Sequence, residues 1–174
     1  MGFEVVLGDI TQIKTDAIAN AANTTLLGGG GVDGAIHRRA GKKLLEECKT
    51  LGGCETGKAK ITRGYDLPAS YVLHTPGPIW HGGNRGEDGL LASCYLSCLD
   101  LAEEHGLQSV AFPSISTGVY RFPLERAAKI AVKTIMEYLD TCHSVRKVMM
   151  VCFDERTKRA YDEALEEYTA QKTN

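Results

Sequence analysis

A carboxylate close behind a run of glycines is the clearest chemical feature of this sequence. Residues 28–31 are four consecutive glycines, called here the glycine loop, and Asp33 follows two positions later. Glycines allow backbone amides to come close to a ligand, and the start of a helix favours an anion. Asp33 could orient or deprotonate a water molecule beside bound phosphates, or it could cap a helix that begins here. Position alone does not choose between these two interpretations.

A second loop, called here the hydroxyl loop, has the sequence PSISTGVYRFP and spans residues 113–123. Ser114, Ser116, Thr117 and Gly118 lie between an expected strand and an expected helix, where small hydroxyls and a glycine suit phosphate oxygens. Each of the two loops alone is more typical of an ordinary turn. Two such loops facing each other predict a clamp for a diphosphate.

Four further side chains have both a structural and a binding interpretation. Asn20 and Asn23, three apart in NAAN, could hydrogen-bond sugar hydroxyls or simply form a turn. Asp9, in GDIT (8–11), could accept a hydrogen bond from a purine amine or cap a helix. Phe153 could stack on a base, although an aromatic residue at a strand end usually packs in the core. The sequence leaves these alternatives open.

Histidines and cysteines give no metal-binding pattern. The five histidines show no HExxH spacing, so His37 is expected to be a packing or surface residue of a helix and His74 a strand residue. The six cysteines include no CxxC pair. Cys94 and Cys98 are four apart on a helical stretch, which indicates a buried apolar stripe. We therefore expect reduced cysteines and no metal site.

The string GGGVDG (29–34) matches the dinucleotide fingerprint G-x-G-x-x-G, but its context does not fit. Residues 23–27 separate it from the preceding strand, and the acids that follow, Glu46 and Glu47, lie inside a helix. A Walker A loop is excluded because no Gly-Lys-Ser/Thr follows. A flexible linker is also a poor fit between a strand and a helix of a compact domain. An oxidoreductase that uses a dinucleotide is therefore disfavoured.

Short apolar segments alternate with helical periodicity along the chain. The expected strands are 3–8, 17–22, AKITRG, YVLHTPG, 109–115 and VRKVMMVCF. The expected helices are 34–51, interrupted by Gly41, 89–106, 123–139 with Pro123 in the first turn, and 155–170. This alternation predicts an α/β fold, a three-layer α/β/α sandwich with a central mixed sheet, as one domain over 1–174. Ligands of such sheets bind at the strand ends, where the unusual loops 8–11, 20–34, 74–83 and 113–123 lie.

Charge and hydropathy exclude several classes of protein. The net charge is −2 and no Lys/Arg block stands out, so a grip on long nucleic acid is disfavoured. The first ten residues lack the charged and long apolar regions typical of a signal peptide, and no apolar run has the length of a membrane span. We expect a cytoplasmic monomer without membrane association.

Taken in order and spacing, the segments GDIT, NAAN, LLGGGGVDGAIHRRAG, HTPGPIW and ISTGVYRFP resemble the macrodomain family. The resemblance is specific to its MacroD-type branch of ADP-ribosyl hydrolases and O-acetyl-ADP-ribose deacetylases, and it covers about residues 3 to 168. It implies a macrodomain that binds ADP-ribose in a cleft at the strand ends, without metal or cofactor. The partners implied are ADP-ribose, ADP-ribosylated proteins and O-acetyl-ADP-ribose.

The resemblance also assigns roles to residues. Asp9 and the Ile10 amide would read the adenine, with Phe153 stacked near it. Asn20, Asn23 and Asp33 would surround the distal ribose, Asp33 activating a water and Asn23 holding the sugar. The two loops would face each other across the diphosphate through Gly29, Gly30, Gly31 and Val32 on one side and Ser116, Thr117, Gly118, Val119 and Tyr120 on the other.

Two functions follow from this resemblance, and one residue departs from it. The first is hydrolysis of ADP-ribosyl esters, including ADP-ribose on Asp or Glu side chains; the alternative is a module that reads ADP-ribose without turnover. Asp33 separates them, because a reader needs no carboxylate beside the distal ribose. Arg121 stands where the family commonly has glycine, a residue that adopts positive φ more readily than Arg. We expect Arg121 to alter loop mobility or to place a guanidinium at the rim.

Overall fold

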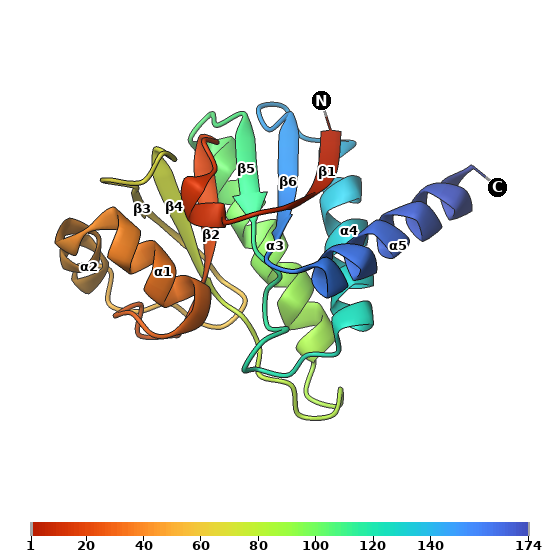
Figure 1. The fold of residues 1–174 in the computed structure, drawn as a ribbon, viewed down its shortest axis with the longest axis horizontal. Coiled ribbons are helices and arrows are strands. Elements are labelled where there is room, and N and C mark those ends of the chain that lie inside the picture. The colour runs from red at the N-terminus through yellow and green to blue at the C-terminus, as the bar shows by residue number, and fades with distance from the viewer. Residues whose placement is uncertain (1, 174) are drawn as a thin grey trace.

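The computed structural model, which describes residues 2–173, places a six-stranded sheet between two layers of helices (Figure 1). The strands are β1 (Gly2–Leu7), β2 (Ala17–Ala22), β3 (Lys60–Arg63), β4 (Tyr71–Pro76), β5 (Ser109–Phe112) and β6 (Lys147–Cys152). Their order across the sheet is β1-β6-β5-β2-β4-β3. All neighbours pair in parallel except β3, which is antiparallel to β4. The predicted three-layer α/β/α fold with a mixed sheet is confirmed.

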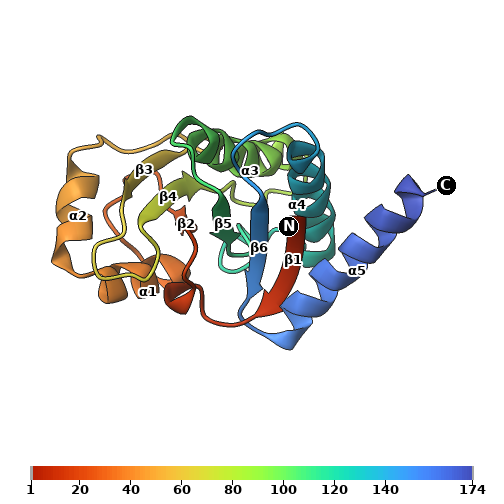
Figure 2. The same cartoon turned by 90° about the horizontal axis from the view of Figure 1, so that it is seen from above.

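The two faces of the sheet are covered by different helices (Figure 2). One layer holds α1 (Gly31–Ala40) and α2 (Lys42–Lys49), which pack with a short 3-10 helix, η1 (Ile10–Gln12). The other layer holds α3 (Glu87–Glu104), α4 (Leu124–Leu139) and α5 (Glu155–Lys172). Strand alternation explains this division. In β2, for example, Ile18 and Ala22 pack in the α1–α2 layer, whereas Ala17 and Ala19 pack in the α3–α5 layer.

Several element boundaries differ from the sequence-based expectation. The helix expected over 34–51 is two helices, because Gly41 lies between them with φ of 91°. Its first helix already begins at Gly31, inside the glycine loop. The strand expected over 109–115 ends at Phe112, since Pro113 cannot donate to a sheet ladder. Pro123 is the residue that precedes α4 rather than part of its first turn.

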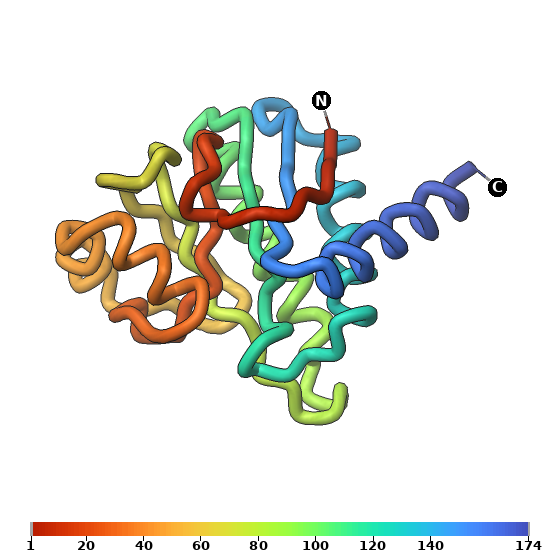
Figure 3. The backbone as a smooth tube through the Cα atoms, viewed as in Figure 1, coloured from red at the N-terminus to blue at the C-terminus, as the bar shows by residue number. Residues whose placement is uncertain are grey.

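The parallel arrangement gathers functional loops at one edge of the sheet. The carboxyl ends of β1, β2, β4, β5 and β6 all lie on this edge, so the loops that follow them meet there. In Figure 3, the segment that follows β4 runs beside the segment that follows β5. A hydrogen bond from the Trp80 N–H to the Tyr120 carbonyl, 2.9 Å long, joins these two segments. This edge is therefore where the predicted site residues can come together.

Candidate functional site

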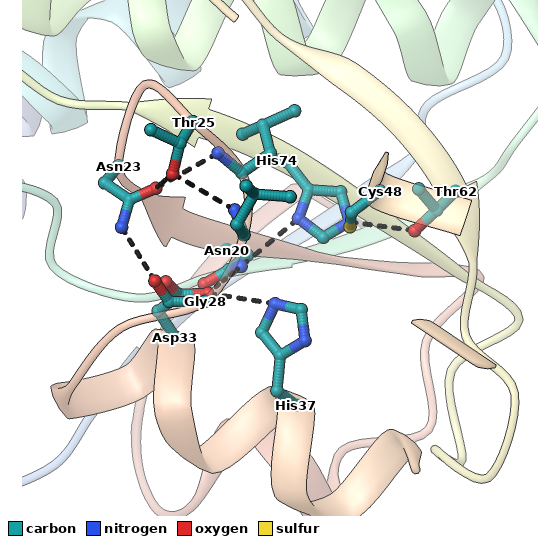
Figure 4. Close-up of polar contacts among 11 residues, drawn as sticks. Asn20, Asn23, Thr25, Gly28, Asp33, His37, Cys48, Thr62 and His74 are labelled. Atoms are coloured by element: carbon teal, nitrogen blue, oxygen red, sulfur yellow. Dashed lines mark hydrogen bonds and ion pairs between the residues drawn. The ribbon is translucent and has the colours of Figure 1, made fainter. Parts of the chain in front are cut away.

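Asp33 lies in α1 with its carboxylate directed at β2 (Figure 4). Its Oδ1 atom accepts a 2.8 Å hydrogen bond from Asn20 Nδ2, and both side chains are buried. The residue that precedes α1 is Gly30, so the interpretation of Asp33 as a helix cap is wrong. At the third position of the helix its charge still favours the helix N-terminus. The carboxylate is held instead by a side chain of the sheet.

His37 also belongs to this group, contrary to the expectation of a packing or surface role. It lies one helical turn after Asp33, which places the two side chains on the same face of α1. His37 Nε2 is 3.3 Å from Asp33 Oδ1 (Figure 4). The spacing of Asp33 and His37 was the one signal in the sequence that could have revealed this pair.

Asn23 organises the turn that leads from β2 to the glycine loop. Its Nδ2 donates to the Gly28 carbonyl at 2.8 Å, and its Oδ1 accepts from the Leu26 amide at 3.0 Å. A Cβ placed on Gly29 would lie 3.1 Å from Asp33 Oδ2 and 3.4 Å from Asn23 Nδ2. The structure thus brings Asn23, Asp33 and the backbone of Gly29 together, as the site prediction requires. The turn-forming interpretation of Asn23 is also correct.

His74 was expected only as a strand residue, yet it lies within this polar group. Its register partner in β2 is Asn20, and both side chains face the α1–α2 layer. His74 Nδ1 is 3.2 Å from Asn20 Nδ2, and His74 Nε2 is 2.8 Å from Thr62 Oγ1 in β3 (Figure 4). Burial, together with the positive potential of His37, lowers the pKa of His74 to about 4, although Asp33 opposes this shift. The ring is therefore neutral near pH 7.

The hydroxyl loop is held by contacts that the sequence did not reveal. Ser114 Oγ lies 2.7 Å from Thr117 Oγ1 and 2.7 Å from the Tyr161 hydroxyl of α5. The Ser114 and Thr117 hydroxyls, for which phosphate binding was expected, therefore already have hydrogen-bond partners within the protein. The Tyr95 hydroxyl of α3 accepts from the Ile115 amide at 3.3 Å. These contacts fix the loop backbone rather than present its side chains.

Ser116 differs from its neighbours. Its φ is 67°, and its Oγ is buried without a hydrogen-bond partner among residues 2–173. A Cβ on Gly77, which follows β4, would clash with Ser116 Oγ and Ile115, so a glycine is required at 77. The backbone after β4 thus lies close against the Ser116 side chain.

The outer parts of both loops are open. A Cβ added to Gly30, Gly31 or Gly118 would meet no other atom within 4 Å. Val119 is 91% exposed. Gly30, Gly31 and Gly118 are also exposed, so an incoming anion could approach their backbone, as the diphosphate clamp requires.

The residues predicted for the adenine follow β1 and β6, at the same edge of the sheet. Asp9 Oδ1 accepts from the Thr11 amide at 2.9 Å and from its hydroxyl at 2.7 Å, so Asp9 does cap a short helix, η1. Ile10 is buried. Phe153 is 89% exposed, which excludes the core-packing interpretation and leaves its ring free to stack.

Arg121 has a φ of 63°, a region that an L-residue other than glycine rarely adopts. Arg121 therefore adopts the backbone conformation that the family's usual glycine takes more readily. The Arg121 amide donates to the Gly118 carbonyl at 3.0 Å, and the Phe122 amide donates to the Ser116 carbonyl at 2.9 Å. These bonds close the tight turn that imposes the conformation.

Glu87 is a further residue that sequence reasoning missed. It lies in the first turn of α3, and its carboxylate accepts from the amides of His81, Gly83 and Arg85 at 2.6–3.0 Å. Desolvation opposes ionisation, but these amide donors outweigh it and lower the pKa of Glu87 to about 2. Glu87 thereby fixes the loop that follows Trp80, the residue bonded to the hydroxyl loop. An acidic residue just after a glycine-rich stretch was the available signal.

Residues 2–173 contain neither a metal-binding cluster nor a membrane-spanning helix. No group of three or more His, Cys, Asp or Glu side chains is placed to hold a metal ion there. None of the helices in this part of the chain combines the length and the apolar character needed to cross a membrane.

Fold and site together define an α/β/α domain with a buried Asp–Asn pair and two open loops at one edge of a mixed sheet. A profile of the family described as "Macro domain" matches residues 19–131. A macro domain-containing protein of Chlorobaculum tepidum is 59% identical over 160 residues, covering 92% of this chain and 93% of the relative. A Klebsiella pneumoniae protein named O-acetyl-ADP-ribose deacetylase is 53% identical over 169 residues, covering 95% and 97%.

Solved structures show the same relationship. A mutant macrodomain of Oceanobacillus iheyensis with ADPR superposes with a TM-score of 0.93 at 43% identity, covering 97% of this chain and 94% of the other. The Trypanosoma brucei macrodomain in complex with ADP-ribose gives a TM-score of 0.88 at 44% identity, covering 94% and 68%. The chain belongs to the macrodomain family.

Proposed function

We propose that this protein binds ADP-ribose and hydrolyses ADP-ribosyl esters, both O-acetyl-ADP-ribose and ADP-ribose attached to Asp or Glu side chains. The observation that carries the proposal is the Asp33 carboxylate, held by Asn20 and placed against the Gly29 backbone. A reader of ADP-ribose would need the loop amides but not this carboxylate. The names of the Klebsiella pneumoniae relative and of the Trypanosoma brucei complex support the substrate class.

In this proposal, different residues of the site bind different parts of ADP-ribose. The open backbone at Gly30 and Gly118 binds the diphosphate, while exposed Phe153 stacks near the adenine that Asp9 and Ile10 read. Asn20 and Asn23 hold the distal ribose. The remaining predicted ligand residues, Gly29, Gly31, Val32, Ser116, Thr117, Val119 and Tyr120, line the two loops.

Asp33 acts on water in this proposal. As a carboxylate it orients a water molecule and accepts its proton while the water attacks the ester. The bond between the acyl carbon and the ribose oxygen breaks, and Asp33 returns the proton to that oxygen, so that a carboxylic acid and ADP-ribose with a free hydroxyl are released. For O-acetyl-ADP-ribose the acid is acetate; for a modified protein it is the side chain of Asp or Glu.

The direct test incubates the protein with O-acetyl-ADP-ribose and with auto-ADP-ribosylated protein, and measures released acetate and ADP-ribose. Turnover of either ester supports hydrolysis. Calorimetric binding of ADP-ribose without turnover of either ester would identify a reader instead. Absence of both binding and turnover would overturn the whole proposal.

A further inference from the structure

The hydrogen-bond chain behind Asp33 extends three residues into the sheet. It consists of Asp33, Asn20, His74 and Thr62, and we call it the buried polar chain. Asn20 and His74 are fully buried and Thr62 nearly so. The four residues come from α1, β2, β4 and β3, so their meeting depends on the assembled sheet rather than on local sequence.

The chemistry of the end groups fixes the orientation of Asn20. A carboxylate only accepts hydrogen bonds, so the 2.8 Å contact with Asp33 Oδ1 must come from the amide nitrogen of Asn20. That nitrogen has a second hydrogen, and His74 Nδ1 lies 3.2 Å from it. His74 Nδ1 must therefore accept, and its ring hydrogen must be on Nε2.

Thr62 completes this assignment. His74 Nε2 lies 2.8 Å from Thr62 Oγ1, so the Nε2 hydrogen has an acceptor. If the ring hydrogen were on Nδ1 instead, the N–H groups of His74 Nδ1 and Asn20 Nδ2 would point at each other, and Nε2 could no longer donate to Thr62. The charged ring would have the same conflict with Asn20. Neutral His74, with its hydrogen on Nε2, is the one form that satisfies all these contacts.

We infer that His74 is a positioning residue that fixes the Asn20 amide, which in turn holds the Asp33 carboxylate in its reactive orientation. This inference rests on the proposed hydrolase function of Asp33. The geometry gives each link one direction: Asn20 Nδ2 donates to Asp33 Oδ1 and to His74 Nδ1, and His74 Nε2 donates to Thr62 Oγ1. The lowered pKa of His74 agrees with it, because the ring stays neutral down to acid pH.

The orientation of the Asn20 amide also determines the surroundings of its oxygen, Oδ1. Asn20 Oδ1 is buried and has no hydrogen-bond partner among residues 2–173. A buried acceptor without a donor is unfavourable, because it has lost its hydrogen bonds to water. Because His74 and Asp33 both require the nitrogen, the oxygen is left without a donor, and the contacts with His74 and Asp33 must hold the amide against this penalty.

Two substitutions of His74 separate positioning from packing. His74→Leu removes the acceptor for Asn20, whereas His74→Asn offers an amide oxygen near the place of Nδ1. We expect His74→Leu to lower kcat for O-acetyl-ADP-ribose by up to about a hundredfold with little change in KM, as misplacement of a catalytic group does. His74→Asn should recover much of that loss. Equal losses in both variants that track their melting temperatures would overturn the inference.

A second substitution, Thr62→Val, tests the contact between His74 and Thr62. It keeps the shape of the side chain but removes the acceptor for the Nε2 hydrogen, so it should lower kcat in the same direction and by less. An unchanged kcat in Thr62→Val together with an unchanged kcat in His74→Leu would contradict the inference.

Nitrogen NMR of the folded wild-type protein tests the chain without any turnover, and it remains valid if His74→Leu fails to fold. The inference predicts the His74 hydrogen on Nε2 at neutral pH and two protected, distinct Asn20 amide protons. A hydrogen on Nδ1 would refute the inference. Lack of ester hydrolysis by wild-type protein would refute the proposed function instead, so the two failures are distinguishable.

Discussion

The carboxylate side and the phosphate side of the candidate site are built in different ways. Around Asp33, buried side chains from four elements hold one another in a single hydrogen-bonded order. Around Gly30 and Gly118, the backbone is open and its side-chain neighbours are absent within 4 Å of an added Cβ. Side-chain identity therefore matters on the first side, and backbone accessibility matters on the second. Substitutions on the carboxylate side should therefore lower the rate of hydrolysis, and substitutions on the phosphate side should lower the affinity for ADP-ribose.

The largest expected effect is the loss of ADP-ribose binding in Gly118→Leu, a substitution on the phosphate side of the site. The protein has room for the side chain, so folding should be kept, but the side chain would occupy the space of the diphosphate. We expect loss of ADP-ribose binding by calorimetry with an unchanged melting temperature. Gly89→Leu, at an exposed and equally open position of α3, is the matched control and should bind normally. Normal affinity in Gly118→Leu would contradict the clamp.

The buried polar chain should make the free energy of unfolding depend on pH through His74. Because the pKa of His74 is lowered from 6.5 to about 4, the unfolded chain binds a proton that the folded protein does not between these values. The free energy of unfolding should therefore fall as the pH decreases from 6.5 towards 4, by at most about 1.4 kcal/mol per pH unit from this group. The groups that face His74 are Asp33, His37 and Cys48.

Denaturant titrations of wild-type and His74→Asn protein at pH 6.5, 5.5 and 4.5 measure this contribution. Other titrating groups are shared, so the difference between the two slopes reports His74. Identical slopes would mean that His74 does not remain neutral in the folded protein.

The smallest expected effect concerns the strained turn of the hydroxyl loop. Arg121→Gly relieves a positive φ that costs about 1–2 kcal/mol for an L-residue, but it adds backbone entropy to the unfolded chain. We expect a net rise in the free energy of unfolding below about 1 kcal/mol, measured by urea titration. A clear loss of stability would show that the Arg121 side chain itself supports the loop.

The fold was predictable from sequence because its signals are local. AIANAA is short, apolar and bounded by polar residues, and it forms β2 with the predicted limits. The helix start at Gly31 was missed because glycine has low helix propensity, so the apolar spacing indicated a helix only from residue 34 onward.

The candidate site was predictable only in part, and the reason lies in long-range contacts. Asp33 and Asn20 stood out through their positions after a glycine run and within a strand. His74 and Thr62 did not, because a histidine in a strand gives no sign of which buried amide it will meet across the sheet. Likewise, nothing in PSIS showed that Ser114 would bond to Tyr161, 47 positions further along the chain.

The most direct test of the proposed hydrolase is a paired measurement on Asp33→Asn, which preserves the size of the side chain while removing its capacity as a base. Single-turnover hydrolysis of O-acetyl-ADP-ribose and calorimetric affinity for ADP-ribose are measured on the same preparation. The account predicts a loss of at least about a hundredfold in rate with affinity retained. Unchanged turnover in this variant would contradict the catalytic role of Asp33.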